Sequence, residues 1–394
     1  MSYLDKLLTG RPVTWKPLGE VCETVTDFTA AGSFASNAKN VKYLKVPDYA
    51  LMVRTTDLKQ CFSNSESFVF VDEHAFSYLW RVNLDTESII LPNVGNCGEV
   101  YFTTPKDLPH THCVLGPNAL LLRSRKATNK YLYYWFQCLD FQRSLLKITS
   151  NTGQSKFNKT NLKKISIPIP PKDVQEEIVR VLDRFTDLEA ELEAELEARQ
   201  KQYAYYRDLL LTFPDDAVTY LPLGDIADIK RGKRVVRKDL AEEGSYAVFQ
   251  NSLTPLGYFD KWNVPKDSCF VVAAGAAGEI GYSRENFWAA DDIYYFESSG
   301  NLIDRYLYHF LLSSKHMITS KVRTASIPRL SRIALERLPI PIPPLEEQER
   351  IVGILDRFET LAHSITEGLP RELELRRKQY SYYRDLLLDF HPQD

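Results

Sequence analysis

The chain contains one stretch of sequence twice, and this repeat constrains the fold more than any other feature. Residues 167–185 read IPIPPKDVQEEIVRVLDRF and residues 340–358 read IPIPPLEEQERIVGILDRF, with thirteen of nineteen positions identical. The match resumes at residues 199–213 (RQKQYAYYRDLLLTF) and 376–390 (RRKQYSYYRDLLLDF), and the second copy is four residues longer between the two segments. Matching segments in a fixed order indicate a duplicated architecture.

Shorter matches extend the repeat beyond these segments. In chain order the matched pairs are 16–24 with 221–229, 95–100 with 275–280, and 130–136 with 305–311. Each match is short, but their shared order indicates that a whole half of the chain is duplicated. A further trace, YLDKLLT at residues 3–9, resembles YRDLLLT at 206–212. We therefore expect residues 1–16 to pack near the C-terminal helix, in a circular arrangement.

Each copy of the repeat predicts a short extended segment followed by a long helix. The prolines of IPIPP have no backbone N–H and hold their neighbours extended, as in a stiff linker or a strand end. Acidic residues follow in the first helical turn of both copies, which suits the helix dipole. We expect one helix over residues 172–213, roughly 60 Å long if it is continuous. We expect a second helix over residues 345–394, which Gly368 and Pro370 kink or break.

Apolar residues recur along both predicted helices at spacings of three, four and once seven. Matching stripes of this length favour an antiparallel coiled coil between the two helices. Plain amphipathic packing of each helix against a domain is the alternative. The residues that we expect at the helix pair or at a partner interface are Ile178, Phe185, Leu188, Leu192, Leu196, Tyr203, Tyr206, Ile351, Phe358, Leu361, Ile365, Tyr380 and Tyr383.

The first predicted helix contains a repeat of its own. Residues 188–198 read LEAE twice and then LEA. One four-residue unit rotates a helix by about 400° and lengthens it by about 6 Å, so the apolar face is nearly preserved. Slippage within this repeat would therefore change the length of the helix without scrambling its stripe.

The segments between the helices are unlike each other in sequence but alike in character. Residues 17–171 and 214–344 both mix short β-rich runs with Gly, Asn and Pro turns, and each ends in an aromatic, helix-like segment. We therefore expect an α+β fold, in which two pseudo-repeated α/β domains are separated by two long antiparallel helices with pseudo-two-fold organisation.

Basic and amide side chains gather in loops of these two domains. KRGKRVVRK at 230–238 holds six cations in nine residues, and the loop at 150–164 corresponds to the one at 323–332. Lys and Arg suit phosphate contact, and Gln, Asn, Arg and Ser suit contact with base edges. Solvated basic loops are the plainer alternative. The candidate DNA-binding residues are Arg54, Thr56, Gln154, Lys156, Asn158, Lys159, Lys230, Arg231, Lys233, Arg234, Arg237, Asn251, Arg323, Arg329 and Arg332.

The charge of the chain is unevenly spread. The formal net charge is -3, which alone argues weakly against nucleic-acid binding. Residues 173–199 carry ten acids against three bases, a local charge of -7, so the rest of the chain sums to -3 + 7 = +4. The acidic helix thus masks a mildly basic remainder.

Several classes of protein are disfavoured by what the sequence lacks. It has no apolar run of the roughly 18 residues that a membrane helix needs, and its N-terminus does not resemble a secretory signal. The six cysteines are scattered without a CxxC pair, so we expect reduced cysteines and no metal site. Neither an Asn/Asp-Pro-Pro-Tyr/Phe motif of adenine methyltransferases nor a P-loop is present, so we expect no catalytic residues.

The alternation of two variable domains with two repeated helices is similar to a known family. Helices that begin PIPPxxEQxxIVxxLDRF and end KQYxYYRDLLL resemble those of the specificity subunit of type I restriction–modification systems. The first copy reads Val174-Gln175, so the acidic residue before the glutamine is present only in the second copy. The LEAE repeat resembles the subgroup whose central helix varies by four-residue units. The resemblance covers essentially the whole chain and is strongest in the helices.

The resemblance implies a non-catalytic subunit that directs DNA methylation and restriction. Each variable domain would be a target-recognition domain that reads one half of a bipartite, asymmetric site in double-stranded DNA. The helices would set the spacing and dock two methyltransferase subunits, and motor–nuclease subunits would join that core. S-adenosylmethionine, ATP and magnesium would then belong to these partners, in the cytoplasm. A related assembly with a fused methyltransferase–nuclease partner, a coiled-coil scaffold that binds only proteins, and an enzyme in its own right remain alternatives.

Overall fold

The computed structural model of the chain describes residues 3–8, 10–150, 153–214, 217–236, 238, 240–324, 326–364 and 366–390. It divides into two units, one of residues 1–190 with 375–394 and one of residues 191–374. Each unit combines segments from both sequence repeats, so neither unit is a simple half of the chain. None of the helices in the described part of the chain is both long and apolar enough to cross a membrane.

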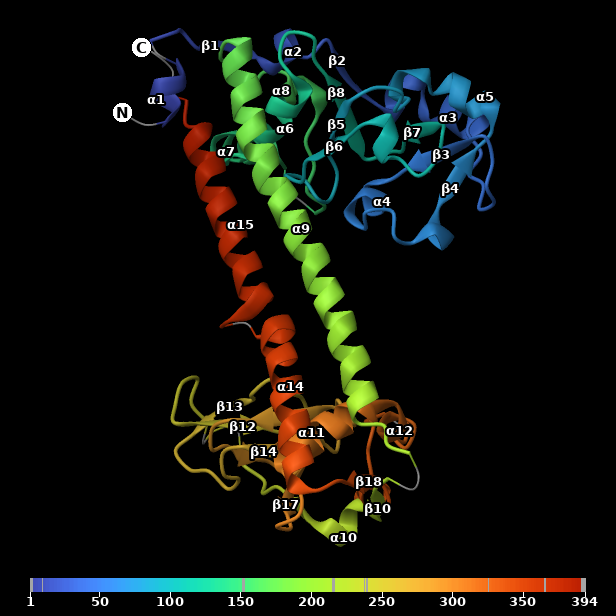
Figure 1. Cartoon of the computed structure of the whole chain (residues 1–394). Coiled ribbons are helices and arrows are strands. Elements are labelled where there is room, and N and C mark those ends of the chain that lie inside the picture. Colours follow the sequence, from blue (N-terminus) through green and yellow to red (C-terminus); the bar gives the residue numbers. More distant parts are fainter. Residues whose placement is uncertain are drawn as a thin grey trace. The chain divides into compact units, whose positions relative to one another are not determined.

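The first unit is built on two small sheets and a separate strand pair (Figure 1). Its strand pair is β1 (Thr14–Pro17) with β9 (Ser166–Ile169), and its sheets have the orders β2-β8-β5-β6 and β4-β3-β7. The remaining strands are β2 (Thr24–Asp27), β3 (Ala50–Val53), β4 (Val69–Val71), β5 (Ser88–Pro92), β6 (Tyr101–Thr103), β7 (Cys113–Leu115) and β8 (Ala119–Arg123). Its short helices are α1 (Tyr3–Leu8), α2 (Leu18–Val21), α3 (Phe34–Asn40), α4 (Thr55–Lys59), α5 (Glu73–Tyr78), α6 (Asn129–Gln137), α7 (Leu139–Ile148) and α8 (Lys159–Leu162).

The second unit repeats this topology strand for strand. Its strand pair is β10 (Thr219–Pro222) with β18 (Pro339–Ile342), and its sheets have the orders β11-β17-β14-β15 and β13-β12-β16. In each three-stranded sheet one pairing is antiparallel and the other, β3 with β7 or β12 with β16, is parallel. The strands are β11 (Ala227–Arg231), β12 (Tyr246–Phe249), β13 (Gly257–Phe259), β14 (Ser268–Val272), β15 (Ile280–Ser283), β16 (Trp288–Ala289) and β17 (Ile293–Ser298), and the short helices are α10 (Leu223–Ile226), α11 (Asp304–Ser313), α12 (Lys315–Thr319) and α13 (Arg332–Glu336). The duplication expected from the sequence is confirmed.

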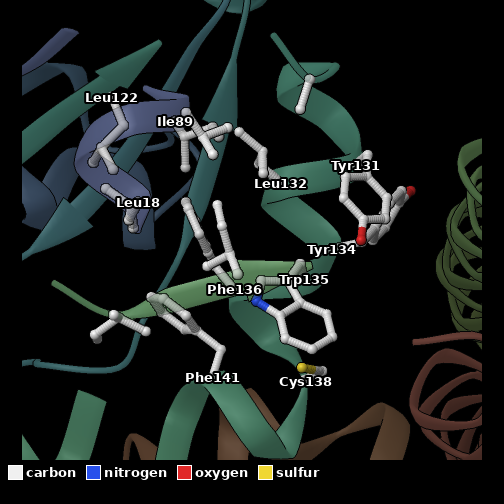
Figure 2. Packing of buried hydrophobic residues seen from close by; sticks show 14 of the residues in the cluster. Leu18, Ile89, Leu122, Tyr131, Leu132, Tyr134, Trp135, Phe136, Cys138 and Phe141 are labelled. Atoms are coloured by element: carbon white, nitrogen blue, oxygen red, sulfur yellow. The ribbon is translucent and has the colours of Figure 1, made fainter. Parts of the chain in front are cut away.

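The aromatic segment of each domain forms the helix that fills its core. Figure 2 shows α6 presenting Leu132 and Phe136 toward Ile89 and Leu122 of the sheet, whereas Tyr131 of the same helix lies beside Tyr134 on the other side. All of these side chains are fully buried. Burying such large apolar surfaces stabilises a domain by roughly 1.5–3 kcal/mol per side chain. This helix therefore contributes a large share of the buried apolar surface of the core.

The IPIPP segments are strands rather than free linkers. β9 and β18 pair antiparallel with the segments that precede each PLG motif, β1 and β10. Each is paired on one side only, and such edge strands tolerate prolines because the missing N–H is not needed for a second neighbour. The start and the end of each domain are thus held together next to a long helix.

Each predicted long helix is present, and the second is interrupted. Helix α9 (Lys172–Leu210) is continuous over 39 residues, whereas α14 (Leu345–His363) and α15 (Gly368–Leu387) are separate helices. Gly368 has φ +78°, and a Cβ at this position would lie 2.4 Å from the Thr360 carbonyl oxygen. Pro370 then falls in the first turn of α15, where an N–H is not required. The predicted break at these two residues is confirmed.

The predicted stripes contact both a partner helix and a domain. In the first unit Phe185 stacks on Tyr383 with ring centroids 5.4 Å apart, and in the second Phe358 stacks on Tyr206 at 5.2 Å. The phenylalanine of each repeat thus meets the tyrosine of the other, as expected for a pseudo-two-fold helix pair. Three of the other stripe residues are buried in the domain cores, namely Ile178, Ile351 and Tyr203. The half-buried ones are Leu192, Leu196 and Tyr380, and the exposed ones are Leu188 and Leu361. Ile365 lies outside the described residues.

The N-terminal segment joins the end of the C-terminal helix within the first unit. Leu7 and Leu8 pack against the core cluster that contains Leu387 and Phe390. The circular arrangement expected for residues 1–16 is therefore present.

Two glycines of the second unit offer a matched test of how tightly the β14–β15 strand pair is packed. A Cβ on Gly281 would lie 2.2 Å from the ring of Phe270 in the paired strand, whereas a Cβ on Gly353 of α14 has no neighbour within 4 Å. Gly281→Ala should lower the free energy of unfolding by about 1–3 kcal/mol, because the buried ring must shift. Gly353→Ala should raise it by about 1 kcal/mol through helix propensity. Urea unfolding of both variants checks this, and an unchanged midpoint for Gly281→Ala would contradict the packing.

Candidate DNA interface and helix junctions

A buried glutamine joins each long helix to its domain. In the first unit Gln175 of α9 accepts a hydrogen bond from the Thr128 backbone N–H (3.0 Å) and donates one to the Pro170 carbonyl (2.8 Å). Gln175 is only 2% exposed. The amide thereby ties the start of α9 to the start of α6, and it also satisfies backbone groups that helix ends leave unpaired.

The second unit has the same junction at the equivalent glutamine. Gln348 of α14 accepts from the Ile303 backbone N–H (2.9 Å) and donates to the Asn301 and Pro343 carbonyls, both at 2.9 Å. Gln348 is fully buried. The glutamine of the repeated PIPPxxxQ motif is therefore a structural connector in both halves.

A repeated tyrosine adds a second tie between each aromatic helix and its edge strand. The Tyr131 hydroxyl donates to the Pro168 carbonyl at 3.0 Å, and the Tyr306 hydroxyl donates to the Pro341 carbonyl at the same distance. Both rings are fully buried, so each hydroxyl needs this partner. The IPIPP strand is thus held from the helix side as well as from its paired strand.

The aspartate of each LDRF motif anchors the long helix through different partners in the two units. In the first unit Asp183 accepts from the Tyr134 hydroxyl at 2.5 Å and pairs with Lys130 at 2.9 Å. Burial, followed by the hydrogen bond to Asp183, raises the pKa of Tyr134. The tyrosine therefore stays neutral and keeps its proton available to the carboxylate.

In the second unit a partly buried ion network takes the place of these two contacts. Asp356 accepts from His309 Nε2 (2.8 Å) and from Arg305 Nε (2.7 Å), and Glu359 also pairs with Arg305. Burial alone would lower the pKa of the Arg305 guanidinium, but the charges of Glu359 and Asp356 raise it. Burial works against ionisation of Asp356 too, yet the hydrogen bond from His309 and the charge of Arg305 lower its pKa.

This network also bears on metal binding. His309, Asp356 and Glu359 offer ligand atoms within 4.8 Å of one another. The Arg305 guanidinium already contacts both carboxylates. Its Cζ also lies 4.4 Å from the ring centroid of Tyr282 and 4.7 Å from that of Tyr308. The positive charge that this cluster requires is thus supplied by the protein itself, and the cluster functions as a helix anchor.

Away from the helices, each domain carries a short arm docked on a glycine turn. The first arm (Ser150 and 153–157) closes through paired backbone hydrogen bonds between Ser150 and Lys156 at 2.9 and 3.1 Å. The Gly95 N–H donates to the Ser155 carbonyl (2.8 Å). Gly95 has φ +84°, a backbone conformation that favours glycine.

The second arm (323–324 and 326–330) has the same construction. Arg323 and Arg329 exchange backbone hydrogen bonds at 2.9 and 3.2 Å, and the Gly275 N–H donates to the Pro328 carbonyl at 3.2 Å. Gly275 has φ +87°, like its counterpart. The structure therefore holds two arms of different sequence in one common backbone frame.

Comparison with known proteins identifies the family. The family described as "Type I restriction modification DNA specificity domain" matches residues 12–198 and 216–375. The chain belongs to this family of type I specificity subunits. A Haemophilus influenzae protein assigned as a type I restriction enzyme specificity subunit is 32% identical, with 99% of this chain and 98% of that protein covered. The specificity subunit of the Escherichia coli type I enzyme EcoR124I/EcoR124II is 30% identical, with 99% and 97% covered.

Solved structures agree on the fold. The S subunit of a type I restriction–modification system from M. genitalium has a TM-score of 0.58 at 16% identity, with 100% of both chains covered. A chain from work on complex assembly of the type I system has a TM-score of 0.57, also at 16% identity, with 96% of this chain and 98% of that chain covered. The two-domain α+β architecture is thus that of type I specificity subunits.

Within this family member, several predicted DNA-binding residues are occupied by contacts inside the domain. Arg54 donates to Asp57 (2.9 Å) and to the Ser67 carbonyl (2.8 Å), and the hydrogen bond to Asp57 raises its pKa. Asn158 caps α8 through a hydrogen bond from the Asn161 N–H (2.8 Å), and Lys159 pairs with Asp27 at 3.0 Å. These side chains shape the domain surface.

In the basic cluster of the second domain, too, some side chains are held by contacts inside the domain and others are not. Lys230 pairs with Asp228 (2.8 Å), Arg231 donates to the Asp291 carbonyl (2.6 Å), and Arg332 pairs with Glu336 (2.7 Å). By contrast, Lys233 and Arg234 are exposed, and their side chains make no ion pair with any described residue. Arg237 lies outside the described residues.

The two arms bring together the candidates that remain available. Gln154 and Lys156 in the first arm, and Arg323 and Arg329 in the second, are exposed and form no ion pair with described residues. Asn251 lies beside the second arm, because its carbonyl accepts from Ala276 in the same glycine turn (2.9 Å). Thr56 is exposed on α4, apart from the arm residues in sequence and fold.

The junction residues escaped sequence reasoning because their types suggested nothing unusual. Gln175, Gln348, Asp183 and Asp356 lie on helices where polar residues normally face solvent. Their signal was identity between the two copies at positions flanking the apolar stripe. A polar residue retained in both copies of a diverged repeat can therefore mark a buried connection.

The junction can be tested with neighbouring residues of α9. Gln175→Leu leaves the Thr128 N–H and the Pro170 carbonyl without their partners and should lower the free energy of unfolding of the first unit by about 2–4 kcal/mol. Glu176→Leu, at an exposed position one residue further on, should change it by no more than about 0.5 kcal/mol. Urea denaturation measures both, and equal midpoints for the two variants would contradict the connector role.

Proposed function

We propose that this specificity subunit reads a bipartite, asymmetric DNA site, one half with each domain. The observation that carries the proposal is the pair of arms, which share one backbone frame but differ in sequence. A common frame places a different set of side chains against each half-site. Basic and amide residues on these arms supply the phosphate and base-edge contacts that DNA reading requires.

The long helices would set the distance between the half-sites. Helix α9 has 39 residues, which corresponds to about 58 Å, or roughly 17 base pairs of duplex. Two half-sites contacted by separate domains would then be separated by a spacer that neither domain reads. The LEAE units of α9 lie in its middle and provide a means of changing that spacing.

Methylation and cleavage would be performed by partner subunits. We infer that two methyltransferase subunits and motor–nuclease subunits assemble on this chain in the cytoplasm, and that they bring S-adenosylmethionine, ATP and magnesium. A fused methyltransferase–nuclease partner would serve the same role. The chain itself would be the non-catalytic recognition part. A scaffold without DNA specificity is the alternative, and mapping of modified adenines distinguishes the two.

A duplicated aromatic surface supports docking of two copies of one partner. Tyr205 and Tyr382, from the KQYxYYRDLLL motifs, are 63% and 65% exposed. Each lies edge-on to the following tyrosine, with ring centroids 5.4 Å apart and an interplanar angle of 74° in both copies. Exposed aromatic side chains are typical of protein interfaces. Two equal surfaces are suited to two identical methyltransferase subunits.

Mapping of modified adenines in cells that carry this chain and its methyltransferase partner tests the reading and spacing roles. Deletion of one unit, residues 192–195, should shorten the spacer by about two base pairs, because α9 loses about 6 Å. Both half-sites should keep their sequences. Glu193→Gln, which preserves the length of the unit, is the control and should leave the whole site unchanged. Changed half-sites with an unchanged spacer would rule out the ruler role.

The docking surface has its own test. Tyr205→Ala and Tyr382→Ala should each reduce the complex from two methyltransferase subunits to one, and the double variant should bind neither. Native mass spectrometry of the co-expressed complex gives the stoichiometry. Trp262→Ala, which removes another exposed aromatic side chain (46% exposed) from the second domain, should leave it at two. Two subunits bound to the double variant would refute the surface.

A further inference from the structure

We propose that Gln154 and Ile327 are the specificity-determining residues at equivalent positions of the two arms. Gln154 reads an adenine edge in one half-site, and Ile327 contacts a thymine methyl group in the other. The inference rests on the proposed function and names the two side chains that make the half-sites differ.

The equivalence of the two positions follows from the hydrogen bonds of the arms. In the first arm, Ser155 accepts from Gly95 and Phe157 donates to the Asn93 carbonyl (3.1 Å). In the second, Pro328 accepts from Gly275 and Leu330 donates to the Ala273 carbonyl (2.8 Å). Gln154 and Ile327 each immediately precede the docked carbonyl, so they occupy the same place in the frame.

The exposure of side chains follows the same pattern in both arms. Residues 153–157 and 326–330 are, in order, exposed, exposed, half-buried, exposed and buried. The last side chain anchors each arm in its domain, as Phe157 and Leu330 are 5% and 3% exposed. Because anchor, docking bond and exposure agree, differences in recognition must come from the exposed side chains.

Two of the exposed positions have different roles. Lys156 corresponds to Arg329, so both arms present a cation there, as expected for a phosphate contact that carries no sequence information. Two residues earlier the chemistry differs completely, with the amide of Gln154 in one arm and the aliphatic Ile327 in the other. Sequence information can therefore enter at this position.

The environment of each side chain fits its proposed target. Gln154 Nε2 lies 3.2 Å from where a Cβ on Gly95 would be, so the side chain extends over the glycine turn, and no described residue hydrogen-bonds to its amide. A glutamine amide offers the donor and acceptor that match the N6 and N7 groups of adenine. Ile327 is 52% exposed between the exposed Ser326 and the half-buried Pro328. An apolar side chain in the major groove matches the thymine methyl group.

The test maps modified adenines with the full chain and its methyltransferase partner. Gln154→Ala should relax the preference at one adenine–thymine pair of one half-site by roughly ten- to a hundred-fold and leave the other half-site and the spacer unchanged. Ile327→Ala should relax one position of the opposite half-site, by about ten-fold. The half-site that each variant still reads shows that the complex has folded.

Controls and contrary outcomes separate this inference from the function on which it rests. Lys156→Gln and Arg329→Gln should weaken methylation at every site without changing the motif, because phosphate contacts are blind to sequence. If Gln154→Ala and Ile327→Ala both methylate the wild-type motif with undiminished discrimination, these two residues do not determine specificity and the inference is overturned. The bipartite function would still stand. A wild-type complex that methylates without a bipartite motif would overturn the proposed function, and the inference with it.

Discussion

One buried amide side chain in each half determines how a long helix is attached to its domain. Gln175 and Gln348 each hold a backbone N–H at the start of an aromatic helix and a carbonyl at the end of an IPIPP strand. Gln175 and Gln348 are only 2% and 0% exposed, so losing the amide would leave buried backbone groups unpaired, at a cost in free energy. Each glutamine therefore fixes the place at which a long helix leaves its domain.

Around this fixed junction the two halves have diverged in graded steps. The tyrosine that supports the edge strand is unchanged in Tyr131 and Tyr306. The aspartate anchor is retained, but His309 and Arg305 replace Tyr134 and Lys130, and Glu359 joins the contact. At the arms only the backbone frame is shared. Divergence therefore differs from contact to contact, and it is largest in the side chains of the arms.

Much of the architecture followed from the repeat alone. Because copies of one sequence fold alike, the duplicated segments predicted two similar domains and two long helices before any contact was known. Gly368 and Pro370 predicted the break between α14 and α15 from backbone chemistry. The apolar stripe was harder to interpret. Ile178 and Ile351 face the domain cores, while Phe185 and Phe358 stack on a tyrosine of the other helix. Periodicity predicts an apolar face but does not say whether a domain or a helix covers it.

The candidate site shows where sequence stopped being sufficient. Composition and spacing were enough to identify the duplicated plan, the acidic helix and the loops in which basic residues gather. Whether a given side chain in those loops is available was decided by its neighbours in space. Arg54 and Lys156 are both candidate DNA-binding residues in the sequence, but Asp57 holds the first and no described acid pairs with the second. Ion pairs and hydrogen bonds join residues distant in the chain, so only the tertiary structure could separate cations that stabilise a domain from those that face solvent.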